Sequence, residues 1–241
     1  MTALVAGLAS RPLASSSYAI LLPLGLIALT VVALLAWVRP LLVAILGFGL
    51  LAVVKVEPAP VDLVFATLIA VSVAVSNVRP RVPVVIEGIL VAMIVLTIAS
   101  SVNAIDTTRA IAYGSITLYL VVFGLWLTWF FTHERGTRLA MIAYIVVAAL
   151  SAAAVIVALY GNLPGWDLFL YDPSRGQGLF KDPNVYAAFL VPPTVIVLEE
   201  IGSPALLPAR RLLTVPLFIL LVGGVVVGFS RGAWLDLALA V

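Results

Sequence analysis

The chain has 241 residues, of which 64% are hydrophobic and 10% are charged, whereas a soluble domain is about 45–50% apolar and about 25% charged. A fold of this size in water cannot bury so much apolar surface, so the composition predicts an all-α, polytopic integral membrane protein. The net charge of +2 is too small to indicate nucleic-acid binding, and a chain with no Cys and one His, His133, offers neither disulfides nor His- or thiolate-based metal sites.

Apolar stretches follow one another along the chain, and a transmembrane helix needs about 20 mostly apolar residues. The stretches fall at 18–38, 41–54, 61–78, 83–100, 110–131, 139–160, 185–198 and 212–229, and a ninth begins at Trp234. Because the 41–54 stretch is short, the first two stretches could instead form a tight hairpin. We expect one transmembrane domain over 1–241, a bundle of about eight to nine helices that crosses a lipid bilayer.

The basic residues between the stretches predict the orientation. If every stretch crosses, one side holds seven of the thirteen Lys and Arg residues, at 39, 79, 81, 135, 138, 210 and 211. The other side holds six, and three of these have a suspected function, at 175, 181 and 231. Setting those three aside leaves seven against three, which places the first side in the cytoplasm and the 161–184 connection outside it.

The 161–184 connection is by far the longest between two stretches, and connections beyond about 12–15 residues are usually functional or disordered. It contains the polar, glycine-broken run "SRGQGLFKDPNVYAAFL" at 174–190, in which Asp182 is placed to cap the next helix and Pro183 to begin it. An arginine among glycines just before a helix start suits a phosphate, since guanidinium groups and free N–H groups both bind phosphate oxygens. The alternative is that Arg175 binds lipid headgroups and that "DPN" is an ordinary cap.

A second polar motif lies one helix pair later. The run "GFSRGAWLDLALA" at 228–240 places Ser230 and Arg231 between apolar segments, on the same predicted side as the 161–184 connection. A membrane-embedded charge costs about 2.5–3.5 kcal/mol at a helix centre on insertion scales, which makes Arg231 a functional candidate. The alternatives are a buried ion pair with Asp236 and an arginine that reaches the membrane surface.

The two motifs, with their order and spacing, resemble the O-antigen ligase and O-antigen polymerase superfamily. The resemblance is carried by "RGQGLFKDPNVYAAFL" at 175–190 and by "GFSRGAWLDLALA" at 228–240, and it is weaker before residue 160. It implies a membrane glycosyltransferase in the bacterial cytoplasmic (inner) membrane. Such a protein moves a glycan from a polyprenyl (undecaprenyl) pyrophosphate carrier to a glycan or lipid-linked acceptor, outside the cytoplasm and without a metal or cofactor.

The resemblance also assigns roles to individual residues. Arg175 and Arg231 match the family's arginines and are expected to bind the donor pyrophosphate, although Arg231 could instead hold the loop in place. The remaining matches shape the two motifs: Gly176, Gly178, Phe180, Asp182, Pro183, Asn184 and Ser230. The family continues beyond the position of Val241 with more helices and a large loop that carries a histidine, so we expect the N-terminal part of a longer protein, inactive by itself.

Two other functions remain open. A transporter or flippase for a lipid-linked or anionic substrate would use similar apolar helices, but transporters favour broken helices at the membrane midplane and paired repeats. The polar residues here gather toward one side, and no repeat is visible. A non-catalytic membrane scaffold is the third possibility, and it would leave Arg175 and Arg231 dispensable.

Overall fold

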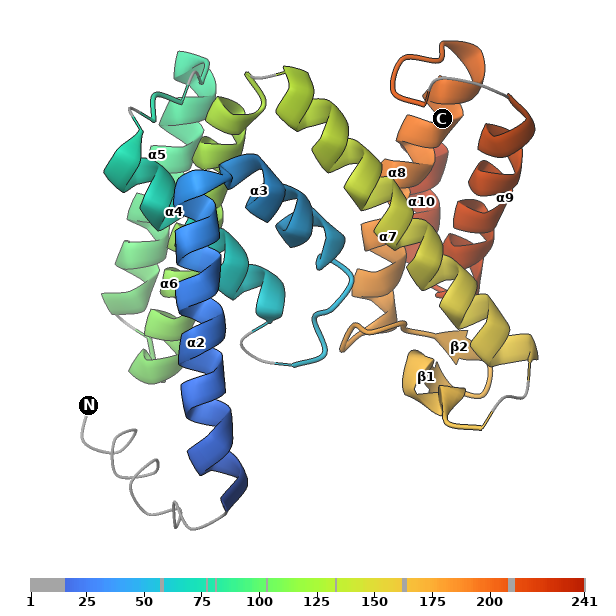
Figure 1. Ribbon diagram of the computed structural model, residues 1–241, viewed down its shortest axis with the longest axis horizontal. Coiled ribbons are helices and arrows are strands. Elements are labelled where there is room, and N and C mark those ends of the chain that lie inside the picture. Colours follow the sequence, from blue (N-terminus) through green and yellow to red (C-terminus); the bar gives the residue numbers. More distant parts are fainter. Residues whose placement is uncertain are drawn as a thin grey trace.

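A computed structural model describes residues 16–56, 59–76, 78–80, 82–102, 104–132, 134–161, 164–207 and 211–240. This part of the chain forms nine α-helices and one small hairpin (Figure 1). The helices are α2 (Ser16–Val38), α3 (Pro40–Gly49), α4 (Pro60–Val75), α5 (Val84–Val102), α6 (Thr107–Phe130), α7 (Glu134–Tyr160), α8 (Pro183–Gly202), α9 (Arg211–Val227) and α10 (Arg231–Ala240). Between α7 and α8 lie the 3₁₀-helix η1 (Trp166–Phe169) and the antiparallel strands β1 (Leu170–Asp172) and β2 (Arg175–Gly176).

Proline and aspartate mark where several helices begin. Pro40, Pro60 and Pro183 each open a helix, at a position where the missing N–H group costs nothing. Asp106 caps α6 by accepting a hydrogen bond from the backbone N–H of Arg109 at 3.0 Å. These starts are set by local chemistry, which is why most predicted stretches begin close to an observed helix.

Helix α3 begins where predicted but ends early, at Gly49, while the predicted stretch continues to residue 54. The chain leaves the helix there, and the backbone N–H of Val54 donates to the carbonyl of Leu179 at 3.0 Å. A contact with a segment far along the chain thus replaces the last turn of helix. The tight-hairpin alternative is partly met, since α2 and α3 are separated only by Arg39 and pack against each other.

The helices pack around two cores. One core joins α2, α3, α4 and α6 around Phe65, which lies 4.8 Å from the ring of Phe123 and 6.0 Å from that of Trp126. The other joins α7, α8, α9 and α10 around the fully buried Tyr186 and Leu190. Helix α7 links the two cores, because it contributes Ala140 to the first and several residues from 145 to 155 to the second.

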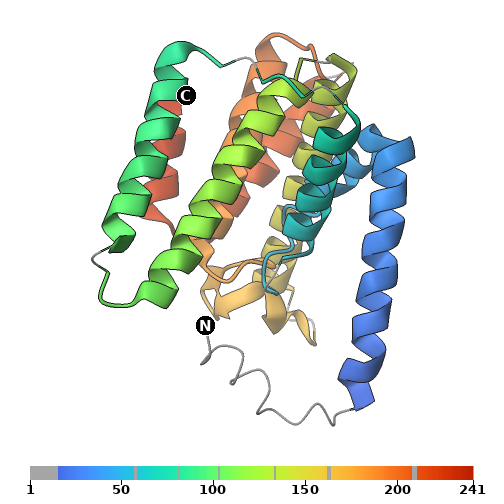
Figure 2. The same ribbon diagram turned by 90° about the vertical axis from the view of Figure 1, so that its left-hand side faces the viewer.

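The helix connections alternate between two ends of the bundle (Figures 1 and 2). One end carries η1, β1 and β2, the α5–α6 connection and the start of α10, and we call it the hairpin end. The opposite end carries the α2–α3, α4–α5, α6–α7 and α8–α9 connections. The two polar motifs therefore lie toward the same end.

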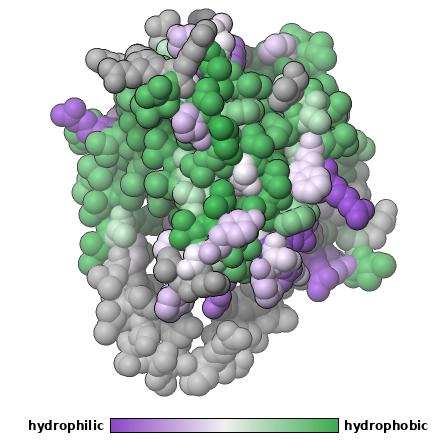
Figure 3. Space-filling view, turned by 90° about the vertical axis from the view of Figure 1, so that its right-hand side faces the viewer, coloured by the Kyte–Doolittle hydropathy of each residue, from purple (hydrophilic) through white to green (hydrophobic). Residues whose placement is uncertain are grey.

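The outside of the bundle is apolar, as expected for a protein whose solvent is lipid. Helix α5 has no buried residue although it is almost entirely apolar, and the face in Figure 3 is hydrophobic over most of its height. In the described residues four helices are long and apolar enough to cross a membrane: Val84–Val102, Thr107–Phe130, Gly136–Tyr160 and Pro183–Gly202. The helical fold with long apolar helices is confirmed, and the number of helices that cross the membrane stays a prediction.

Candidate functional site

The segment between α7 and α8 folds over the end of the bundle instead of extending from it. After Gly165, whose φ of +80° favours glycine, η1 leads into β1, which pairs with β2. The backbone N–H groups of Gln177 and Gly178 both donate to the carbonyl of Phe169, and the side-chain amide of Gln177 donates to the carbonyl of Leu170 at 2.9 Å. These bonds close the 169–178 segment on itself, and the close approach of Gly176 to Val155 places β2 against α7.

Arg175 connects the two polar motifs. Its Nε donates to the carbonyl of Gly228 at the end of α9, and its Nη2 donates to Oδ1 of Asn184 in the first turn of α8, both at 2.9 Å. The guanidinium also lies 5.9 Å from the centre of the Tyr171 ring, within the range of a cation–π interaction. A guanidinium has five N–H donors, so these two bonds fix its plane and leave the Nη1 edge available.

Glycines let the motifs come this close. A Cβ atom at Gly176 would collide with the Cγ1 atom of Val155 on α7. Gly178, Gly224 and Gly228 all face the Tyr186 ring, where a Cβ would lie 3.1–3.3 Å from ring atoms or the hydroxyl oxygen. Tyr186 thus occupies a space made by glycines of both motifs.

Among the predicted motif residues, Phe180 is a core residue, with its ring 5.0 Å from that of Phe189.

The start of α8 has the capping chemistry that its sequence predicts. Asp182 is the N-cap and accepts a hydrogen bond from the backbone N–H of Asn184, and Pro183 is the first helical residue. The backbone N–H of Asn184 is already bonded to Asp182, so Asn184 takes part in the site through its side chain. That side chain orients Arg175 by accepting from Nη2.

The second motif forms the turn between α9 and α10. Phe229 has a φ of +48°, which reverses the chain, and buried Ser230 caps α10 through a 3.3 Å hydrogen bond from the backbone N–H of Ala233 to its Oγ. Arg231 is the first residue of α10, and its side chain is exposed. Arg175 binds this turn through the carbonyl of Gly228, and the choice between the two roles considered for Arg231 stays a prediction.

Lys55 is a member of the site that sequence reasoning missed. Its Nζ donates to the carbonyl of Leu168 at 2.8 Å, and the neighbouring Val54 bonds to Leu179, so the α3–α4 connection holds both ends of the hairpin segment. The signal available in the sequence was a lone lysine in a connection predicted to share the side of the 161–184 segment. Its partner is 113 residues away, which no local pattern reveals.

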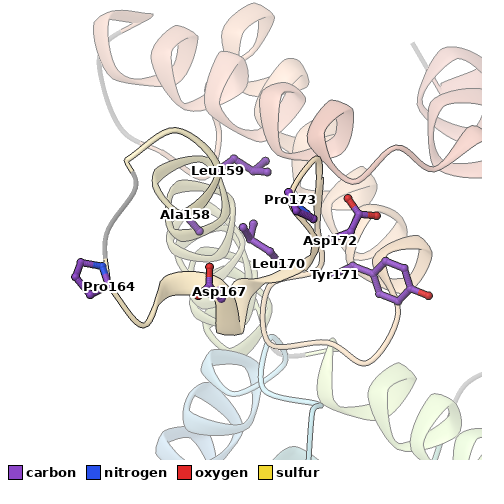
Figure 4. Close-up of a pocket in the computed structure, with 8 residues that line it drawn as sticks. All are labelled: Ala158, Leu159, Pro164, Asp167, Leu170, Tyr171, Asp172 and Pro173. Atoms are coloured by element: carbon purple, nitrogen blue, oxygen red, sulfur yellow. The ribbon is translucent and has the colours of Figure 1, made fainter.

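A cavity of about 580 Å³ lies on the α7 side of the hairpin (Figure 4). Its walls come from the end of α7, from η1 and from β1, and its acidic residues are Asp167 and Asp172. The hydroxyl and the backbone N–H of Ser174 donate to Asp172 at 2.7 and 2.8 Å. These bonds, with a smaller effect of the Arg175 charge, lower the pKa of the Asp172 carboxyl below its ordinary value of 3.8.

The comparisons with family models, curated proteins and solved structures find no match to this chain. The resemblance to the O-antigen ligase and polymerase superfamily therefore stays a prediction from the sequence, carried mainly by the two motifs and their spacing.

Proposed function

We propose that this protein is a membrane glycosyltransferase of the O-antigen ligase or polymerase type. It takes a glycan from a polyprenyl-pyrophosphate carrier and transfers it to a glycan or lipid-linked acceptor. The helices cross the bacterial cytoplasmic membrane eight or nine times, and the hairpin end lies outside the cytoplasm.

The observation that carries the proposal is the fixed guanidinium of Arg175. It lies at the junction of the two motifs that resemble the family, held by Gly228 and Asn184 and with its Nη1 edge available. A cation whose position is set before the ligand arrives stabilises developing negative charge without reorganisation. Arg231 begins α10 beside the same turn, where an exposed guanidinium adds to the positive end of the helix.

The proposed reaction needs such a cation. The oxygen of an acceptor hydroxyl forms a bond to the anomeric carbon of the donor sugar, and the bond from that carbon to the pyrophosphate oxygen breaks. The pyrophosphate leaves with the bonding electrons, and the hydroxyl proton passes to water or to the departing group. Negative charge thus develops on the pyrophosphate, at the place assigned to Arg175 and Arg231.

The test uses the complete gene in cells that lack their own enzyme. Polysaccharide laddering and surface attachment are compared on gels for the wild type, Arg175→Ala, Arg231→Ala and, as a control at the opposite end of the bundle, Arg39→Ala. We expect Arg175→Ala and Arg231→Ala to lose most of the glycan and Arg39→Ala to retain it. Full glycan from both hairpin-end variants, at wild-type protein levels, would show that the assignment is wrong.

A further inference from the structure

The cavity beside the hairpin adjoins the Arg175 contacts, because Tyr171 belongs to both. Figure 4 shows Asp167, Leu170 and Pro173 around it, with Leu159 of α7 behind them. Its volume of about 580 Å³ falls in the range of roughly 300–1,000 Å³ that is usual for small-molecule sites. Small-molecule sites combine apolar walls with a few polar groups. Here α7 and β1 supply apolar side chains, and two carboxylates supply the polar groups.

The carboxylates are available to a hydrogen-bond donor. Both Ser174 bonds to Asp172 end on Oδ1, so Oδ2 can accept from a ligand. Asp167 is exposed, and its carboxylate has no hydrogen-bond partner within the described ranges. Hydrogen bonds to a charged carboxylate are stronger than neutral ones, and neighbouring sugar hydroxyls suit such acceptors. In the described part of the chain no three His, Cys, Asp or Glu side chains are grouped so that they could hold a metal ion.

Strand β1 contributes both to the cavity wall and to the Arg175 contacts. Tyr171 and Asp172 belong to the cavity wall, while the Tyr171 ring also lies 5.9 Å from the Arg175 guanidinium and Asp172 pairs with Arg175 across the hairpin. A ligand in the cavity and an anion on Arg175 would therefore be neighbours.

We propose that this cavity binds the hydroxyl groups of a glycan, and that this glycan is the acceptor of the transfer reaction. That the glycan is the acceptor rests on the proposed function, whereas the binding of a glycan in this cavity does not. Asp167 and Asp172 orient the sugar through hydrogen bonds. Asp172 acts as a positioning residue and not as the base, because a carboxylate already stabilised by Ser174 holds a proton weakly.

The experiment measures binding and transfer separately. The protein in lipid nanodiscs is titrated calorimetrically with the lipid-free oligosaccharide released by mild acid from the source cells' own glycan carrier. We expect Asp167→Asn and Asp172→Asn each to weaken binding about tenfold or more, the usual effect of losing a charge-assisted hydrogen bond. Asp106→Asn, an acid at the same end but outside the cavity, is the matched control.

Each outcome decides one of the two claims. The glycan site would be overturned if the wild type did not bind the oligosaccharide or if all variants bound it equally. It would also be overturned if the protein released heat on titration with calcium and not with the oligosaccharide. Binding that depends on both carboxylates, in a protein that transfers no glycan in the gene-complementation test, would leave the site standing and refute the proposed function. When transfer is observed, Asp172→Asn is expected to raise the KM for the acceptor and leave the KM for the donor unchanged.

Discussion

Arg175 and Gly228 are 53 residues apart in the chain, and a 2.9 Å hydrogen bond from the Arg175 Nε to the Gly228 carbonyl joins them. This bond, with the one to Asn184, turns two separate sequence motifs into a single site. It also means that Arg175 has a structural role in addition to the proposed ligand role.

Replacing Arg175 by lysine tests whether the fork of the guanidinium is needed. Lysine keeps the charge but cannot bond to Gly228 and Asn184 in the same geometry, so we expect glycan transfer to fall at least about tenfold. Leaving the Gly228 carbonyl without its partner should also cost about 1–3 kcal/mol of stability. The control is Arg109→Lys, which alters an exposed pair with Asp106 worth about 0–1 kcal/mol. Equal transfer by Arg175→Lys and the wild type would contradict the proposed geometry.

The adjacent residues Gly223 and Gly224 provide a matched pair for the packing of α9. A Cβ at Gly224 would lie 2.7 Å from atoms of Ala152 and Leu190, so Gly224→Ala should cost about 1–3 kcal/mol by overpacking. A Cβ at Gly223 would lie 3.4 Å from the nearest atom of Ile156, and alanine should there be neutral or stabilising by up to about 1 kcal/mol. Thermal unfolding in detergent measures both variants. A Gly224→Ala protein as stable as Gly223→Ala would refute the close contact of α9 with α7 and α8.

Tyr144 stabilises α8 where two prolines interrupt its hydrogen bonds. Pro193 cannot donate to the carbonyl of Phe189, and the Tyr144 hydroxyl donates to that carbonyl instead, at 2.7 Å. Tyr144→Phe should lower the free energy of unfolding by about 1–3 kcal/mol, because the part-buried carbonyl loses its partner. Tyr113→Phe changes an exposed tyrosine on α6 and should have little effect. Identical melting curves for the two variants would show that the bond contributes nothing.

Glu200 organises the α8–α9 connection at the opposite end of the bundle. Its buried carboxylate accepts hydrogen bonds from the backbone N–H groups of Ala205, Leu206 and Leu207 at 2.8–3.1 Å. Glutamine has one acceptor oxygen in place of two, so Glu200→Gln should lower the free energy of unfolding by about 1–3 kcal/mol. The control is Glu199→Gln, which changes the exposed neighbouring residue. Protease cleavage within 203–207 is the readout. Cleavage at the wild-type rate in Glu200→Gln would argue against this role.

The hairpin turn should depend on pH through Asp172. Its folded pKa lies below the ordinary 3.8, so the carboxylate stabilises the turn above the unfolded pKa, and this stabilisation is lost as the pH falls through the folded pKa. The fluorescence of Trp166, in a variant in which the other tryptophans are replaced, should be constant from pH 7 to about pH 5 and change only below about pH 4. Asp172→Asn should remove this change, and a transition near neutral pH would contradict the assignment to Asp172.

The sequence predicted the features that depend on neighbouring residues. The apolar stretches, the cap at Asp182 and the helix start at Pro183 all follow from chemistry within a few positions. The sequence did not predict the early end of α3 or the contact of Lys55, because both depend on partners more than 100 residues away.

For the site, sequence reasoning found Arg175 but not its partners. A pattern of glycines and an arginine indicates an anion site and cannot show that two of the five N–H groups are already bound within the protein. The cavity next to β1 was also beyond prediction. Its wall combines α7 with a hairpin whose register depends on three-dimensional contacts.

The most direct measurement of the central claim is binding of the carrier itself. Native mass spectrometry of the protein in nanodiscs compares polyprenyl diphosphate with polyprenyl monophosphate, for the wild type, Arg175→Ala and Arg39→Ala. The account predicts that the wild type and Arg39→Ala prefer the diphosphate and that Arg175→Ala loses this preference. A diphosphate preference that survives in Arg175→Ala, or that is absent from the wild type, would contradict it.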